Sequence, residues 1–121
     1  MYRPLTLVLG ASSRSDRYSN RAVRSLRDQG HPVLAIGARE GRVHDVPILT
    51  ELPPGAVVDT VTLYVGSAAL AIWAERLLAM RPRRIVFNPG SENAAFAGLA
   101  EAEGIEVVEG CTLVMLAVGT Y

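Results

Sequence analysis

The feature that most constrains the fold is a regular alternation of short apolar runs with longer amphipathic or alanine-rich segments. The apolar runs are short and rich in β-branched residues, which is typical of buried strands. They are Leu5–Leu9, Pro32–Ile36, Thr60–Val65, Arg84–Phe87 and Glu106–Val108, and the segments that predict helices are Ser19–Gln29, Ala68–Met80 and Glu92–Glu103. Strands joined through helices are parallel, with right-handed crossovers. We therefore expect a Rossmann-like, doubly wound α/β fold with a mainly parallel five-stranded sheet, helices on both faces and three layers.

Two stretches lie outside this alternation. Residues Ala38–Pro54 combine glycine, proline and scattered charge, which predicts mostly connection with a brief extended segment at Val46–Leu49. The tail Leu113–Ala117 is apolar again and is expected to pack on the body of the domain. Together with Trp73, this tail could instead contribute to a homodimer contact.

Length and composition limit the class of protein. With 121 residues, the chain is expected to form one domain, residues 1–121, which can bury a core without disulfides or metal. Half of the residues are hydrophobic, and acidic and basic side chains balance at 12 each. This composition speaks against disorder and against a sequence-independent grip on nucleic acid. The partner is therefore expected to be a small molecule.

The expected compartment follows from cysteine usage and hydropathy. Cys111 is the single cysteine, so no internal disulfide can form and a reducing compartment is expected. The first apolar run, Leu5–Leu9, is too short for a signal peptide. No later segment approaches the roughly 20 apolar residues that span a bilayer. We expect a cytoplasmic protein without a membrane partner.

The loop after the first strand, Gly10–Asn20, is a candidate phosphate site. It supplies glycine, hydroxyl groups, arginines and the amino end of a helix. Free backbone N–H groups and the helix dipole favour an anion there, and Arg17 adds a bidentate cation. The alternative is that Ser19 caps the helix and the arginines are solvated. The position of the loop at the carboxyl end of a strand favours the ligand.

This loop is not the dinucleotide fingerprint. Gly10 is not followed by the second and third glycines of G-x-G-x-x-G, which disfavours a nicotinamide dinucleotide. The second strand ends in Gly37-Ala38-Arg39, with Glu40 one place beyond, rather than in the acid that would hold a ribose diol. Arg39 suits a phosphorylated ribose, which both NADP and coenzyme A carry.

The third and fourth strands end in Tyr64-Val65-Gly66-Ser67 and Asn88-Pro89-Gly90, and the fold brings both segments to the edge where the first loop lies. The segment Asn88-Pro89-Gly90 is explained either by a tight turn that leads into a helix or by ligand contact. Glu92 and Asn93 could cap that helix or meet polar ligand atoms.

The sequence predicts no catalytic set and no metal site. Cys111 is a conceivable nucleophile, but the sequence places neither His31 nor His44 beside it. A lone cysteine is more often a small buried hydrophobe. The two histidines show no metal-ligand spacing and are expected to be structural or surface residues.

Several segments taken together resemble a known family. They are Val8–Ser12, Arg17–Asn20, Gly30–Val33, Asp59–Tyr64, Phe87–Gly90 and Gly104–Val108 with Cys111-Thr112. Through them nearly the whole chain resembles the small bacterial CoA-binding proteins, whose domain is similar to the amino-terminal CoA-binding domain of the succinyl-CoA synthetase α subunit. Many relatives have an Asn-Pro pair after the second strand, where this chain has Gly37-Ala38-Arg39. The synthetase's phosphohistidine lies in another domain, so the resemblance does not imply ligase activity.

The resemblance implies a CoA pyrophosphate at the first loop, an adenosine portion beside Ile36–Arg39, and a pantetheine arm passing Tyr64–Ser67 and Asn88–Gly90. The CoA-binding residues expected in this way are Gly10, Ala11, Ser12, Arg17, Tyr18, Ser19, Asn20, Ile36, Gly37, Ala38, Arg39, Tyr64, Val65, Gly66, Asn88, Pro89 and Gly90.

Two functional hypotheses follow. The first is a stand-alone CoA or acyl-CoA binding module that works as a carrier, sensor or regulatory subunit without catalysis, alone, as a homodimer or with a partner enzyme. The second is a small enzyme, either an NADP-dependent reductase or a thioester-handling enzyme that uses Cys111.

Overall fold

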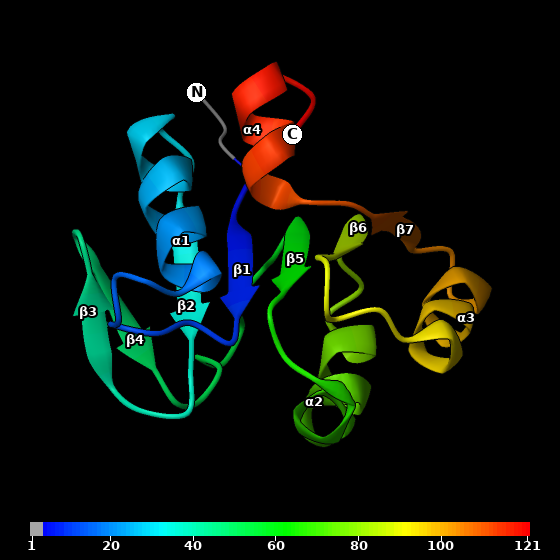
Figure 1. Cartoon of the computed structure of the whole chain (residues 1–121). Helices are drawn as coiled ribbons and strands as arrows, with labels where there is room; N and C mark the ends of the chain where they lie inside the picture. The colour runs from blue at the N-terminus through cyan, green and yellow to red at the C-terminus, as the bar shows by residue number, and fades with distance from the viewer. Residues whose placement is uncertain (1–3) are drawn as a thin grey trace.

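The computed structural model describes residues 4–121 and forms a sheet with helices on both faces (Figure 1). In chain order the elements are β1 (Thr6–Leu9), α1 (Tyr18–Asp28), β2 (Val33–Ile36), β3 (Gly41–Val43), β4 (Val46–Leu49), β5 (Thr60–Leu63), α2 (Ser67–Ala79), β6 (Arg84–Phe87), α3 (Ala94–Ala102), β7 (Glu106–Glu109) and α4 (Thr112–Val118). Every strand and helix that the sequence predicts is present, with ends that differ by a few residues.

The sheet has the order β3-β4-β2-β1-β5-β6-β7, and all neighbouring pairs are parallel except β3 with β4. The chain first builds outward from β1 through β2, and then returns to the other side of β1 to place β5. The strand order therefore reverses beside β1, which is where doubly wound sheets bind ligands. The predicted fold class is confirmed.

The predicted number of five strands is wrong, because the sheet has seven. The stretch expected to be mostly connection contains the hairpin of β3 and β4, which extends the sheet at one edge. Each of these strands is only three or four residues long, and β4 contains Pro47. The extended segment predicted at Val46–Leu49 is β4. The strand that was not predicted is β3, which has three residues, two of them exposed, and therefore shows no apolar run in the sequence.

Two hydrophobic layers flank the sheet, as the three-layer prediction requires. On one face, α1 and α4 pack through Val23, Leu26 and Leu116. On the other face, α2 and α3 pack through residues that include Leu77 and Phe96. Side chains of a strand alternate between the two layers, so the strands between these helices are buried on both sides.

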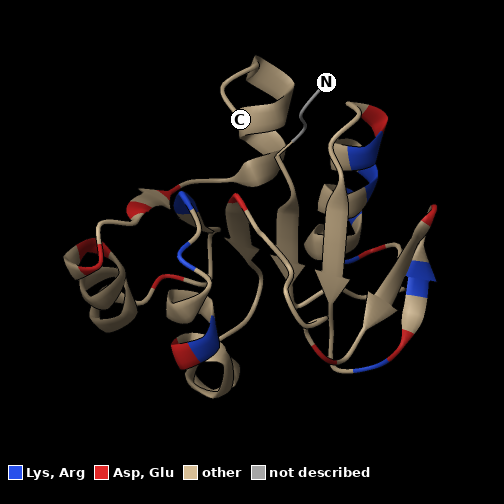
Figure 2. Cartoon of the chain, turned by 180° about the vertical axis from the view of Figure 1, so that it is seen from behind, with Lys and Arg blue, Asp and Glu red and all other residues tan. Residues whose placement is uncertain are grey.

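The apolar tail forms α4 and packs on the sheet, as expected. Thr112 and Leu116 are buried, whereas Val114 and Val118 on the outer side of the helix are more than half exposed. No charged side chain lies on α4 (Figure 2). No helix within residues 4–121 is both long and apolar enough to cross a membrane.

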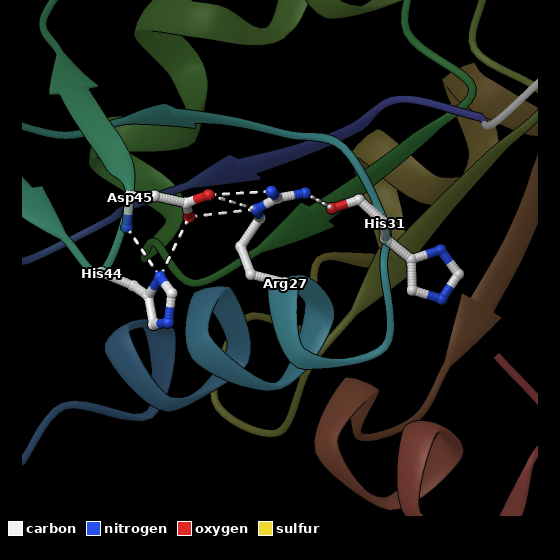
Figure 3. Close-up of polar contacts among 4 residues, drawn as sticks. All are labelled: Arg27, His31, His44 and Asp45. Atoms are coloured by element: carbon white, nitrogen blue, oxygen red, sulfur yellow. Dashed lines mark hydrogen bonds and ion pairs between the residues drawn. The ribbon is translucent and has the colours of Figure 1, made fainter.

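An ion pair fastens the hairpin to α1 (Figure 3). The Nε and Nη2 atoms of Arg27 donate to the Asp45 carboxylate at 3.0 and 2.8 Å, and Nη1 donates to the His31 carbonyl at 2.9 Å. His44, at φ 55°, forms the turn between β3 and β4. The ring of His31 packs edge-on against Tyr121, with 5.3 Å between the centroids. Both histidines thus take part in structural contacts, as the sequence predicted.

Candidate ligand-binding cleft

A cleft of about 1060 Å³ lies at the carboxyl ends of the strands, beside the point where the strand order reverses. Its volume is at the upper end of the range for small-molecule and cofactor sites. Five parts of the chain that are distant in sequence meet there, and the lining residues are Leu9–Arg14, Asp16–Ser19, Ile36–Arg39, Thr50, Tyr64–Gly66, Ala69, Ile72, Trp73 and Pro89–Ser91. All the predicted CoA-binding residues except Asn20 and Asn88 are among them.

Two glycines allow the loops below the cleft to pack backbone against backbone. Gly10 has φ 96°, and a Cβ atom there would lie 2.5 Å from the Tyr64 carbonyl oxygen. A Cβ atom on Gly37 would lie 2.3 Å from the Ala11 carbonyl oxygen. Neither distance is possible for real atoms, so both positions require glycine. The loop that the sequence marked as a phosphate site is therefore held against its neighbours by main-chain contacts, with no side chains between them.

The amino end of α1 opens into the cleft without a side-chain cap. The helix begins at Tyr18, and the N-cap residue Arg17 makes no side-chain hydrogen bond to the first turn. The interpretation of Ser19 as the cap is wrong, because Ser19 lies inside the first turn and is buried. Uncapped N–H groups and the helix dipole stabilise an anion at this point. The N-cap of α2, Gly66, also lines the cleft and also lacks a side-chain cap bond.

Three arginines line the cleft. Arg14 pairs with Asp16 at 3.2 Å, and both side chains are well exposed. Within residues 4–121, the side chains of Arg17 and Arg39 have neither an ion pair nor a hydrogen bond, and both are exposed. Guanidinium groups held near a helix amino end suit the binding of phosphate groups.

Two predicted contact residues lie behind the cleft wall. The Asn20 side chain donates from Nδ2 to the Ser12 carbonyl at 2.9 Å and accepts from Arg24 Nε at 2.8 Å, so it fastens the first loop to α1. Asn88 is 1% exposed, and its amide is bonded entirely within the protein. Glu92 and Asn93 were expected either to cap the following helix or to meet the ligand. Asn93 caps α3 by accepting the Phe96 N–H at 3.0 Å, and Glu92 accepts the Gly90 N–H at 2.9 Å.

The sequence reasoning missed the contribution of α2 to the cleft. Ala69, Ile72 and Trp73 lie on one side of this helix and form an apolar wall, in which Ile72 is 71% exposed. The Arg76 guanidinium lies 4.1 Å from the Trp73 ring centroid and 3.4 Å from the Glu51 carboxylate. Thr50, next to Glu51, also lines the cleft, so the apolar wall belongs to the same end of the cleft as β4. The sequence signal that could have indicated this wall is the alternation of small and large apolar residues along α2.

The other lining residues outside the predicted contact set are Leu9 at the end of β1 and the polar loop residues Ser13, Arg14, Asp16, Thr50 and Ser91, of which Ser13, Arg14 and Asp16 belong to the loop predicted as the phosphate site.

Tyr64 is a titratable residue of the cleft wall. Burial raises the pKa of the Tyr64 hydroxyl to about 12, so this group stays protonated near neutral pH. Within residues 4–121 the hydroxyl is buried without a hydrogen-bond partner at bonding distance, although the neighbouring Thr112 and Thr62 hydroxyls partly offset the rise in its pKa. Cys111 is a free, partly buried thiol that does not line the cleft. Within the described part of the chain, no three His, Cys, Asp or Glu side chains gather as metal ligands.

Residues 5–117 match the family model described as the CoA binding domain. The chain belongs to this family of CoA-binding domains. The resemblance inferred from the sequence is confirmed, and coenzyme A is the ligand class that the family assignment supports. The match runs from the start of β1 to within α4, so it includes every loop that lines the cleft.

Solved structures agree with this assignment. One described as an uncharacterized protein is 38% identical, covers 100% of both chains and has a TM-score of 0.94. A protein from Thermus thermophilus is 23% identical over 98% of this chain and 91% of its own, with a TM-score of 0.86. A hypothetical protein from Pyrococcus horikoshii is 19% identical over 93% of this chain and 80% of its own, with a TM-score of 0.81. The latter two show the fold alone. No curated protein matches the sequence.

Proposed function

We propose that residues 1–121 form a stand-alone domain that binds CoA or an acyl-CoA and acts as a carrier, sensor or regulatory module without catalysis. The family match carries the proposal. The cleft also supports it. Arg17 and Arg39, which have no side-chain partner among residues 4–121, line the same cleft as the amino end of α1, which has no side-chain cap. CoA carries a pyrophosphate and a ribose phosphate, and these anions match the two kinds of cationic group in the cleft.

The topology suggests which part of the ligand lies where. The pyrophosphate would lie over Gly10–Ser12 at the amino end of α1, and the ribose phosphate near Arg39. The adenine would lie against Ile72 and Trp73, because this wall and Arg39 share the β2 and β4 end of the cleft. The pantetheine arm would then leave on the other side, past Tyr64–Gly66 and Pro89–Ser91, towards open solvent.

The composition supports a role in holding a reactive thioester. All 12 basic residues are arginine, so the chain contains no lysine. Lysine amines are nucleophiles that accept acyl groups, whereas the guanidinium of arginine stays protonated and does not. A protein without lysine can hold an acyl-CoA close to its surface without losing the acyl group to a lysine side chain of its own.

Ligand identification tests the proposal. The purified protein is denatured, and the released small molecules are identified by mass spectrometry. Thermal unfolding is then followed with CoA, acetyl-CoA, NADP and NAD added separately. A ligand present at 100 times its Kd stabilises the folded state by about 2.7 kcal/mol, which moves the midpoint by several degrees. Selective stabilisation by CoA or acetyl-CoA supports the proposal. Stabilisation by NADP alone would overturn it in favour of a reductase.

A further inference from the structure

One buried amide connects two of the cleft loops with α4. Asn88 follows β6 directly, and its Nδ2 donates to Thr62 Oγ1 at 2.6 Å and to the Leu63 carbonyl at 2.9 Å. Its Oδ1 accepts the backbone N–H of Thr112, the first residue of α4, at 2.8 Å. Both amide hydrogens and the amide oxygen are therefore used inside the protein.

The bond from the Asn88 side chain to the Leu63 carbonyl takes the place of a backbone hydrogen bond between β5 and β6. At the end of the β1 and β5 pair, the Tyr64 N–H donates to the Leu9 carbonyl at 2.9 Å, and the Gly110 N–H donates to the Phe87 carbonyl at 3.2 Å beyond β6 and β7. Between β5 and β6 the corresponding donor to Leu63 is the side chain of Asn88. The main chain can thus leave the sheet at Asn88 while the Leu63 carbonyl remains satisfied.

The turn that follows Asn88 shapes one wall of the cleft. Pro89 and Gly90 line the cleft, Gly90 has φ 94°, and the Ser91 N–H closes the turn on the Asn88 carbonyl at 2.9 Å. Leu63 immediately precedes the other wall, residues 64–66. The Asn88 side chain therefore fixes the end of one loop against the start of the other.

The same network extends to α4 through hydroxyl groups. Thr62 Oγ1 lies 2.8 Å from Thr112 Oγ1, and both residues are fully buried. Hydrogen bonds in a dry, fully satisfied network hold one arrangement firmly, because any displacement leaves a buried polar group without a partner. The hydrogen bonds of Asn88, Thr62 and Thr112 therefore hold loops 64–66 and 89–91 in place, although both loops lie at the open carboxyl edge of the sheet.

We propose that Asn88 is a positioning residue of the CoA site: it does not touch the ligand, but it sets the spacing of loops 64–66 and 89–91, between which the pantetheine arm passes. This proposal rests on the proposed function for its ligand. A preorganised site binds more tightly because it loses less freedom on binding. Loss of the Asn88 donors should therefore weaken ligand binding by a protein that is still folded.

The test compares three variants of the full chain. Asn88→Asp keeps the size of the side chain and its acceptor, but removes both amide N–H donors; the ionised carboxylate has no donor, and the protonated form has a single O–H. Thr62→Val removes one partner of Asn88 and leaves its bonds to Leu63 and to the Thr112 N–H. Asn93→Ala is the matched control, because Asn93 is also an amide before a helix at this edge, but it only caps α3. CoA affinity is measured by calorimetry, and hydrogen exchange of the free protein is measured by mass spectrometry.

For Asn88→Asp we expect CoA affinity to fall about tenfold or more, as for the loss of a preorganising hydrogen bond, with faster exchange in peptides covering 64–66 and 89–91. Asn93→Ala should lower the thermal midpoint but leave CoA affinity and exchange in these loops close to those of the parent protein. Thr62→Val, which keeps the bond from Asn88 to Leu63, should loosen the loops and weaken CoA binding less than Asn88→Asp does. Should the buried carboxylate prevent folding, Asn88→Ala removes the same donors without introducing a charge.

Parental CoA affinity in a folded Asn88 variant would overturn the proposal, as would a rise in exchange spread evenly along the chain. The exchange readout needs no ligand, so it separates the two proposals. If the parent protein does not bind CoA, but the two loops alone loosen in Asn88→Asp, the proposed function fails and the role of Asn88 in placing the loops stands.

Discussion

The strands of the sheet begin at one side, the amino edge, and end at the opposite side, the carboxyl edge, and these two sides use arginine in opposite ways. At the carboxyl edge, Arg17 and Arg39 line a cleft of about 1060 Å³ and have no side-chain partner among residues 4–121. At the amino edge, the cavity between Thr6, Asp59, Arg84 and Tyr121 measures only about 60 Å³. There Arg83 pairs with Asp59 at 3.0 and 3.1 Å.

The buried Arg84 belongs to the same closed edge. It donates from Nε to Thr60 Oγ1 at 3.0 Å and lies 4.4 Å from the Tyr121 ring centroid. Charge that serves the fold is satisfied within the protein, whereas charge that serves a ligand is left open. The comparison predicts that changes at the amino edge alter stability, and that arginine changes at the carboxyl edge alter binding.

The largest expected effect is a loss of stability at Gly10, where the first loop packs directly on the backbone of Tyr64. Gly10→Ala should destabilise the protein by about 3 to 5 kcal/mol, because the new methyl group meets the Tyr64 carbonyl and the residue keeps a positive φ. Gly90→Ala is the control, since Gly90 also has a positive φ but has open space around its Cβ position. Urea unfolding measures both. Equal losses in the two variants would show that the close contact at Gly10 carries no cost of its own.

The next effect concerns binding. Arg17→Ala should weaken CoA binding by about 1.5 to 3 kcal/mol, the range for a charge-assisted hydrogen bond to phosphate, with little change in stability. Arg83→Ala, at the opposite edge, should leave CoA affinity unchanged. Titration calorimetry of both variants checks the pair. Unchanged affinity in Arg17→Ala would place the phosphate elsewhere.

Acid should weaken the amino edge through Asp59. Burial raises the pKa of this carboxyl, but hydrogen bonds from Arg83 and Thr60 outweigh it and hold the pKa below the ordinary value of 3.8. A depressed folded-state pKa gives stability that is fully present above 3.8 and is lost as pH falls through the folded-state pKa. Asp59→Asn should cost about 1 kcal/mol at pH 7 and flatten the fall in stability below pH 4. Unfolding curves with the same acid slope in both proteins would contradict this.

The smallest effect comes from a pair of tyrosines. Tyr121 Oη is bonded to Thr6 Oγ1 at 2.7 Å, so Tyr121→Phe should destabilise the amino edge by about 1 kcal/mol. The Tyr64 hydroxyl beside the cleft is buried without a partner, so Tyr64→Phe should change stability by less than about 0.5 kcal/mol or raise it slightly. Thermal unfolding of both variants is sufficient. A larger loss for Tyr64→Phe would mean that its hydroxyl is bonded in solution.

The sequence predicts the fold because the order and direction of the strands follow from a local pattern, the alternation of apolar runs with helical segments. Apolar runs such as Thr60–Val65 and helices ended by glycine or proline are strong signals, and the right-handed crossover rule then fixes the topology. The same rule placed the lining loops at one edge, which is why Gly10, Arg39 and Gly66 were found without a structure. Of the hairpin at residues 41–49, the sequence predicted the second strand as an extended segment but not the first, because β3 pairs only with β4 and has no apolar run of its own.

The finer assignment of site residues could not be made from the sequence. Asn88 lies next to the cleft residue Pro89, but a strand end can point its side chain into the cleft or back into the core. Only the positions of Thr62 and Thr112 decide between these directions, and both are distant in sequence. Ile72 and Trp73 were assigned to a helix but not to the cleft, since the face that α2 turns towards the cleft follows from the packing of Leu70 and Leu77 in the core.

The contact between Thr6 and Tyr121 also makes the chain a nearly closed ring, with its first strand and its last described residue joined at one pole. A short linker from residue 121 to residue 4 should therefore permit a circular permutant, with new ends in the exposed His44-Asp45 turn. A fluorescent reporter fused after Tyr121 would lie at the pole opposite the cleft. The fold thus offers a ready scaffold for a CoA biosensor in which the label does not obstruct the ligand.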